Sequence, residues 1–297
     1  MRRLAEWWFG SAPAERLAAL RILIGGYALA YVVVRLPELA GVARYGSKHF
    51  APVGITRVLD APLPASAALV IAIVTAVLLV AFVLGFAFRI TGPLAALALL
   101  WTLTYRNAWG MVFHTENLLV LHMIALAVSP ADHAWAIGKP RAPAAAGYGW
   151  AIKLLAALTV ATYVLAGIAK LRIAGLDWLD GELLRNQIAV DNLRKALLGD
   201  PIAPLAHLVL DHPAQLVVFS VMTLVIELGA PVALVGRRLG YLWALGAWGF
   251  HVGVVLMMNI WFPYPLVGVA FLPLLPAERI AGAVIRAARG IRRRVAR

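Results

Sequence analysis

Long apolar runs that carry almost no charge dominate the pattern of this 297-residue chain. A helix needs about 20 apolar residues to cross the hydrocarbon core, and in lipid every backbone amide must be bonded within the helix. The pattern predicts an all-α, polytopic membrane helical bundle with about eight transmembrane helices, within a range of seven to nine. The eight expected spans, of which the third, fourth and eighth are short, are 17–36, 66–87, 91–106, 115–130, 150–169, 213–235, 240–259 and 263–276.

Two of the connections between these spans are long, at 37–65 and 170–212. The second contains apolar residues at helical spacing over 179–198, which predicts an amphipathic helix lying at the membrane interface. An Ala/Pro-rich stretch at 139–147 is interpreted as a linker. No internal repeat is visible, so the chain is expected to form one domain over 1–297 that ends in a basic cytoplasmic tail at 277–297.

The composition agrees with a membrane protein, because 63% of the residues are hydrophobic and only 14% are charged, whereas a soluble domain has about a quarter of its residues charged. The chain has no cysteine, which excludes disulfides, thiolate metal sites and a cysteine nucleophile. The first apolar run follows Arg2 and Arg3 and is not followed by a small-residue cleavage site. It is therefore interpreted as a retained first helix and not as a signal peptide.

The net charge of +13 is interpreted as basic residues that flank membrane helices on the cytoplasmic side, and no nucleic-acid partner is expected. The tail after the last span is rich in arginine and is expected to lie on anionic headgroups of the lipid bilayer. An even number of spans then places both termini in the cytoplasm, in a multi-pass protein of the plasma (inner) membrane. The 170–212 connection contains five basic residues on the opposite side and departs from this rule.

Four of the ionisable side chains inside the predicted spans stand out, namely Arg21, His122, Glu227 and His251. Each costs roughly 2.5–3.5 kcal/mol on insertion scales, so such groups usually have a partner or a function. Arg21 and Glu227 lie at similar depths, which favours a structural ion pair between them over a catalytic role. The two histidines are interpreted as helix-packing residues. No metal site is predicted, because the seven histidines of the chain show no metal-binding spacing.

Polar and aromatic residues gather in the three connections that the predicted topology places on the outer face. Belts of Trp and Tyr are ordinary at headgroup depth, but the polar residues Asn107, His114, Glu116, Asn117 and Asn259 favour a functional pocket that opens to the outer face. Lys170 ends an apolar helix. Its spacing alone favours a snorkelling anchor over a desolvated lysine that acts as a base.

Three motifs stand in order along the chain: Leu-Gly-Phe-Ala-Phe-Arg-Ile-Thr at 84–91, Tyr-Val-Leu-Ala-Gly-Ile-Ala-Lys-Leu at 163–171 and Asp-Trp-Leu-Asp-Gly at 177–181. They resemble segments of the membrane domain of vitamin K-dependent γ-glutamyl carboxylase. Residues 84–91 are similar to its Gly-x-x-Tyr-Arg-Ile-Ser element. Residues 163–171, Tyr-Val-Leu-Ala-Gly-Ile-Ala-Lys-Leu, resemble its Tyr-Phe-Ile-Ala-Gly-Val-Lys-Lys-Leu segment. Residues 177–181 are similar to the Asp-Trp-Val-Glu-Gly that follows that segment.

Two further elements extend the resemblance. His114-Thr115 matches a His-Ser pair, and residues 251–263 resemble a His…Asn…Phe-Pro-Tyr stretch. The order of the motifs is preserved over about residues 15–276. The chain is therefore identified as a member of the HTTM (horizontally transferred transmembrane) group, to which the membrane half of the carboxylase belongs.

The resemblance implies that Lys170 is the base that deprotonates a reduced vitamin K-like quinol, and that His114 assists the oxidation step. O2 and CO2 would be co-substrates: the quinol anion reacts with O2, the resulting alkoxide removes a glutamate γ-proton, and CO2 traps the carbanion. A dry site suits a lipid-soluble quinol and a strong base. The residues expected to shape the quinol or substrate pocket are Asn117, Asp177, Trp178, Asn259 and Phe262.

The chain departs from the carboxylase pattern at Ala169, where the family has the first lysine of its pair, and one extra residue lies in the span at 115–130. The large extramembrane domain that helps to hold peptide substrates has no counterpart in the resemblance. We therefore expect the base and the quinol chemistry to be retained in preference to protein carboxylation.

Two other functions remain open at this level. The chain is alternatively a non-catalytic accessory or electron-transfer subunit of the DoxX type, with a membrane or secreted protein as its partner, in which case Lys170 is dispensable. A transporter is the third hypothesis. It is disfavoured because no inverted repeat and no paired broken spans are visible.

Overall fold

The computed structural model describes residues 2–110, 112–138 and 147–282. Within these ranges the chain forms helices and turns and no strand, which confirms the all-α prediction. The chain divides into two compact units, Met1–Leu155 with Pro276–Arg297, and Ala156–Leu275, and each is described here by itself. The arginine-rich part of the predicted tail, 283–297, and most of the predicted linker at 139–147 lie outside the described residues.

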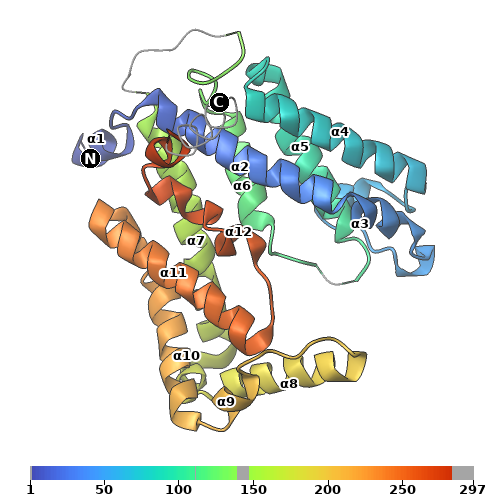
Figure 1. Cartoon of the computed structure of the whole chain (residues 1–297), viewed down its shortest axis with the longest axis vertical. Helices are drawn as coiled ribbons and strands as arrows, with labels where there is room; N and C mark the ends of the chain where they lie inside the picture. Colours follow the sequence, from blue (N-terminus) through green and yellow to red (C-terminus); the bar gives the residue numbers. More distant parts are fainter. Residues whose placement is uncertain (1, 111, 139–146, 283–297) are drawn as a thin grey trace, which may run out of the picture. The chain divides into compact units, whose positions relative to one another are not determined.

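The first unit is built on three long apolar helices. The helix α2 packs against α4, and α4 packs against α5 (Figure 1). A shorter apolar helix, α6, packs against both α5 and α2. The helices of this unit are α1 (Arg2–Trp8), α2 (Ala14–Val34), α3 (Leu36–Gly41), α4 (Ala65–Leu84), α5 (Phe88–Arg106) and α6 (Asn117–Ala127).

The tight turn between α4 and α5 depends on Gly85, whose φ angle of 66° lies in the left-handed region that favours glycine. A Cβ atom at this position would also lie 2.7 Å from Cβ of Ala136 and would overlap the guanidinium of Arg21. That guanidinium is buried, and it donates hydrogen bonds to the carbonyls of Ala131 at 3.1 Å and Trp135 at 2.6 Å. Arg21 therefore ties α2 to the segment that follows α6.

The second unit contains the rest of α7 and everything up to Leu275. Its core lies between α7, α11 and the segments 230–234 and 269–274, around Tyr163, Trp243 and Phe271. Three short 3₁₀ helices of this unit link or follow the α-helices: η4 (Gly175–Asp180), η5 (Ala230–Leu234) and η6 (Val269–Leu274). The α-helices are α7 (Gly149–Ala174), α8 (Glu182–Leu198), α9 (Ala206–Leu210), α10 (Pro213–Leu228), α11 (Arg237–Met258) and α12 (Pro263–Leu266).

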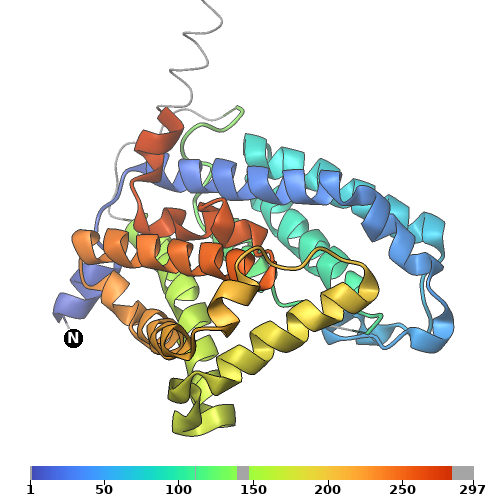
Figure 2. The same ribbon diagram turned by 60° about the horizontal axis from the view of Figure 1, so that its bottom comes forward.

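The helix predicted over 179–198 is present as α8, seen along its length in Figure 2. Leu184 and Ile188 are buried against α9 and α10. The buried Lys195 donates hydrogen bonds to the carbonyls of Met258 and Asn259 at the end of α11. A cation at this place stabilises the helix, because the last carbonyls of a helix have no partner within it.

Among the residues that the structure describes, four helices are long and apolar enough to cross a membrane: α2, α4, α7 with η4, and α11. Two shorter apolar helices, α6 and α10, accompany them, and an all-α helical bundle is confirmed. The eighth predicted span, 263–276, is wrong as a single helix. It consists of α12 and η6, separated by Gly268 with a φ angle of 78°, because proline and glycine interrupt the helical hydrogen-bond ladder.

Candidate functional site

Lys170 lies on the face of α7 that meets α10, and small residues allow the two helices to approach closely there. A Cβ atom on Gly167 would lie 2.8 Å from Cδ2 of Leu228 and 3.1 Å from Cβ of Glu227. Residues three apart lie on the same side of a helix, so Gly167 and Lys170 face the same partner. The Ala-Gly-Ile-Ala-Lys motif thus places the lysine amine next to the end of α10.

Lys170 and Glu227 form an ion pair with 2.5 Å between Nζ and Oε1. The carboxylate side chain is 3% exposed and the lysine side chain 22% exposed. The predicted pair between Arg21 and Glu227 is therefore wrong, because Glu227 is held by Lys170, and Arg21 donates to backbone carbonyls of the first unit. Similar depth along the predicted spans did not identify the partner of Glu227, because the partner depends on which helix faces pack together.

Trp178 covers the lysine from the side of η4. Its ring centroid lies 5.3 Å from Nζ of Lys170, a distance at which a cation is attracted to the face of an indole. The indole Nε1 donates to the carbonyl of Ser220 at 3.2 Å and to Oγ1 of Thr223 at 3.1 Å. These bonds fix the buried Trp178 against α10. The structure thus brings together the sequence-predicted Lys170, Trp178 and Glu227.

Two buried polar atoms of α10 have no hydrogen-bond partner within the described residues: Oε2 of Glu227 and Oγ of Ser220. Glu227 is 2% exposed and Ser220 is fully buried. An unsatisfied buried acceptor is costly, because it has lost water without gaining a replacement. The free carboxylate oxygen is therefore suited to a guest that donates a hydrogen bond.

His251 on α11 is buried and hydrogen-bonded through Nε2 to the hydroxyl of Tyr163 at 2.8 Å. The ring of Phe262 packs against it, with 5.2 Å between centroids. Tyr163 is within electrostatic range of Glu227, so the Tyr163–His251 pair borders the ion pair. Nδ1 of His251 has no hydrogen-bond partner in the described part of the chain.

Asn259 and Asp177 occupy the edges of this unit. Asn259 ends α11 with a φ angle of 47°, accepts a hydrogen bond from the indole of Trp261 at 2.9 Å, and donates to the carbonyl of Pro201 at 3.0 Å. It therefore shapes the loop after α11. Asp177, which precedes the buried Trp178, is exposed.

The helix α8 contributes a charged cluster of Asp191, Arg194 and Lys195 next to the end of α11. Burial by itself would raise the pKa of Asp191, but hydrogen bonds from Arg194 and Lys195 lower that pKa below the usual aspartate value. Asp191 is therefore ionised at neutral pH and holds Lys195 at the end of α11.

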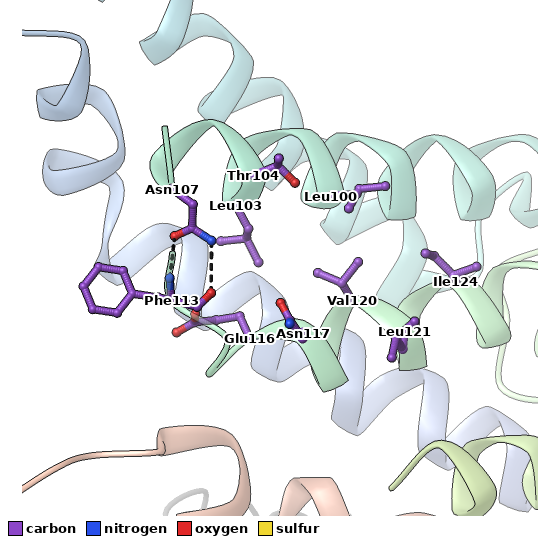
Figure 3. A pocket seen from close by; sticks show the side chains of 10 residues that line it. All are labelled: Leu100, Leu103, Thr104, Asn107, Phe113, Glu116, Asn117, Val120, Leu121 and Ile124. Atoms are coloured by element: carbon purple, nitrogen blue, oxygen red, sulfur yellow. Dashed lines mark hydrogen bonds between the residues drawn. The ribbon is translucent and has the colours of Figure 1, made fainter. Parts of the chain in front are cut away.

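The other two predicted site residues, His114 and Asn117, belong to the first unit and are exposed. Asn117 begins α6 and lines a cavity of about 250 Å³ between α5 and α6. Figure 3 shows that its apolar wall is formed by leucine, valine and isoleucine side chains of the two helices, and that Asn107, Glu116 and Asn117 lie at one end. The side chain of Asn107 is fixed there by two hydrogen bonds with the backbone of Phe113, at 3.0 and 3.3 Å.

A hydrogen-bond network behind this cavity was not anticipated as a unit. The buried carboxylate of Glu116 accepts hydrogen bonds from Tyr31 at 2.8 Å and Thr115 at 2.5 Å, and Arg106 lies 3.6 Å from it. Arg106 also donates to the hydroxyl of Tyr31. In the sequence only Glu116 itself pointed to this network. Its partners Tyr31 and Arg106 come from α2 and α5 and could not be inferred from spacing. His122 on α6 is fully buried and its Nε2 lies 3.1 Å from the carbonyl of Leu155, as expected for a packing residue.

In the described ranges no group of three or more His, Asp or Glu side chains is placed to hold a metal ion. The chemistry that the sites offer is acid–base chemistry and hydrogen bonding: an amine–carboxylate pair in the second unit, and a carboxylate and two amides beside an apolar cavity in the first. A molecule with an apolar body and hydroxyl groups fits the donor and acceptor sets of both.

The chain matches the model of a known protein family over most of its length. The family described as HTTM domain matches residues 9–277, which include every sequence-predicted site residue, the whole second unit and most of the first. No curated protein and no solved structure is significantly similar to the chain.

Proposed function

Because the chain belongs to the HTTM domain family and is an integral membrane protein, we propose that it is an enzyme that deprotonates a reduced vitamin K-like quinol at the Lys170–Glu227 pair. O2 then oxidises the quinol anion to the epoxide, with water as the second product. The observation that carries the proposal is the buried ion pair, in which one carboxylate oxygen has no partner. Its lysine belongs to the segment that resembles the carboxylase.

An amine–carboxylate pair in an apolar environment suits this chemistry. Ionisable groups inside a membrane protein are expensive and usually functional, and a base must be within hydrogen-bond reach of the proton that it removes. Excluding water strengthens each electrostatic interaction and protects a strong base from quenching. Coupling of the oxidation to carboxylation of a carbon acid by CO2, and assistance by His114, are further parts of this proposal.

The test is quinol epoxidation by purified protein in detergent, supplied with reduced vitamin K and O2. Lys170→Met is expected to abolish epoxide formation, whereas Lys153→Met, which changes another lysine of α7, is expected to leave it intact. Removing one partner of a buried pair also destabilises a protein by about 3–5 kcal/mol. The thermal unfolding midpoint of each variant must therefore be measured beside its activity.

A charge exchange separates catalysis from stability. The double variant Lys170→Glu with Glu227→Lys keeps an ion pair but moves the amine to α10. The proposal predicts that this variant recovers the unfolding midpoint lost in Lys170→Met without recovering epoxide formation. Full activity in Lys170→Met, or a well-folded wild-type protein that forms no epoxide from several quinols, contradicts the proposal and favours an accessory subunit of the DoxX type.

We also propose that the protein is multi-pass in the plasma (inner) membrane, with both termini in the cytoplasm. The support is the basic residues that follow the positive-inside rule, such as Arg89, Arg237 and Arg238. The absence of cysteine makes single introduced cysteines clean reporters. A membrane-impermeant maleimide should label Asp200→Cys in intact cells and Arg238→Cys only after permeabilisation, and the reverse pattern contradicts this topology.

A further inference from the structure

We propose that Glu227, and not Lys170, takes up the proton of the hydroxylic substrate, while Lys170 remains an ammonium ion that stabilises the resulting oxyanion. This inference rests on the proposed function, because it assigns roles within the same site. It changes the role that the family resemblance implies for the lysine.

The first reason is the occupancy of the two carboxylate oxygens. Oε1 of Glu227 is 2.5 Å from Nζ of Lys170, and Oε2 is buried with no hydrogen-bond partner in the described part of the chain. A carboxylate oxygen is an acceptor only. A substrate hydroxyl that donates to Oε2 would give this atom the partner that it lacks and would place the proton at hydrogen-bond distance from its acceptor.

The second reason is the state of the lysine. An ammonium group has three donors and no acceptor, so it cannot receive a proton. Nζ of Lys170 lies 2.5 Å from Oε1 of Glu227 and 5.3 Å from the ring centroid of Trp178, and both neighbours attract a cation. Lys170 is the donor and Glu227 the acceptor of the hydrogen bond between them, and the acceptor of the pair that is still open is Oε2 of Glu227.

The proton transfer balances without adding charge to the site. The O–H bond of the substrate breaks and an O–H bond forms at Oε2 of Glu227. The negative charge moves from the carboxylate to the substrate oxygen, and the ammonium of Lys170 keeps its positive charge. The net charge is zero before and after the step, which matters because uncompensated charge is expensive where water is excluded.

Other titratable side chains also lie near Glu227 in the described part of the chain. They are Tyr163 of α7, which is within electrostatic range of Glu227, and His251 of α11, whose Nε2 is bonded to the Tyr163 hydroxyl at 2.8 Å. Ser220 on α10 contributes a second unsatisfied buried atom, Oγ. It lies two helical turns before Glu227, a separation of about 10.5 Å along a helix, and on the same polar face as Thr223.

The experiment uses 1-naphthol, which has a fused aromatic ring and one hydroxyl group and cannot form the epoxide. The ultraviolet absorption of the bound probe distinguishes naphthol from naphtholate, and infrared difference spectra detect a newly protonated carboxylic acid. With the wild-type protein, at a pH where free naphthol is neutral, we expect bound naphtholate together with a carboxylic-acid band. Glu227→Asp should shift that band, whereas Glu182→Gln, which changes an exposed carboxylate of α8, should leave it in place.

The decisive pair of variants is Glu227→Gln and Lys170→Arg. An arginine keeps a positive charge but cannot act as a base, so Lys170→Arg should still ionise bound naphthol, whereas Glu227→Gln should bind it mainly in the neutral form. Glu227→Gln should also lower the rate of quinol epoxidation by roughly 100-fold, the low end of what a positioned acid–base group contributes.

Loss of naphtholate in Lys170→Arg with retention in Glu227→Gln overturns the inference, because Lys170 would then be the acceptor. A wild-type protein that does not bind naphthol, or that binds it without ionising it, overturns it as well. These outcomes are separate from the proposed function, because epoxide formation that requires Lys170 can be observed whichever residue holds the proton.

Discussion

Replacing Gly167 with alanine is expected to weaken the packing of α7 against α10, although alanine is the better helix former. The new methyl carbon would lie 2.8 Å from Cδ2 and 2.9 Å from Cγ of Leu228, and 3.1 Å from Cβ of Glu227. Favourable carbon–carbon contacts occur at about 3.5–4.0 Å. Either the leucine or the end of α10 must therefore shift, and a shift of α10 lengthens the Lys170–Glu227 pair.

Two opposing contributions determine how much Gly167→Ala changes the free energy of unfolding. Overpacking a closely packed site typically costs about 1–3 kcal/mol, and changing glycine to alanine in a helix gains roughly 1 kcal/mol. Gly246 on α11 is the matched control, because its added Cβ would meet nothing within 4 Å and only the gain remains. The free energies of unfolding of Gly167→Ala and Gly246→Ala should therefore differ by about 1–3 kcal/mol, the cost of the overpacking alone.

The assay is unfolding of the purified protein in one detergent, with the free energy of unfolding of each variant compared with that of the wild type. The epoxidation rate, measured in parallel, should fall in Gly167→Ala and stay unchanged in Gly246→Ala. If Gly167→Ala stabilises the protein as much as Gly246→Ala does, the close approach of α7 and α10 is refuted, and with it the packing that positions Lys170.

Two further predictions concern polar contacts away from the ion pair. Lys195→Met removes the cation from the last carbonyls of α11 and should destabilise the protein by about 1.5–3 kcal/mol, the range for hydrogen bonds to charged groups, with faster limited proteolysis of α8. Hydrogen bonds from Arg16, 2.8 Å from the carboxylate, lower the pKa of Glu278. This stabilisation is complete above the usual glutamate pKa of about 4.3 and is lost as the pH falls through the lowered value. The difference in unfolding midpoint between the wild type and Glu278→Gln should therefore vanish in acid, and a difference that persists would contradict the assignment.

The long helices were predictable because their cause is local. An apolar run of about 20 residues can satisfy its backbone in lipid only as a helix, so α2, α4, α7 and α11 followed from composition and length alone. The amphipathic α8 followed from its periodicity. The predicted helix over 263–276 failed because apolar composition outweighed proline and glycine in the prediction, whereas these residues divide the segment into α12 and η6.

The candidate site was predictable only in part. Lys170 and Trp178 were identified by resemblance to a family pattern, which preserves residue types in order along the chain. The partner of Glu227 could not be identified in this way. Its pairing with Lys170 joins residues 57 positions apart and depends on the face that α7 turns toward α10. The sequence by itself therefore determined that charged residues must be paired inside an apolar bundle. Only the tertiary structure decided which residues pair, since the close approach permitted at Gly167 brings the carboxylate of Glu227 to the amine of Lys170.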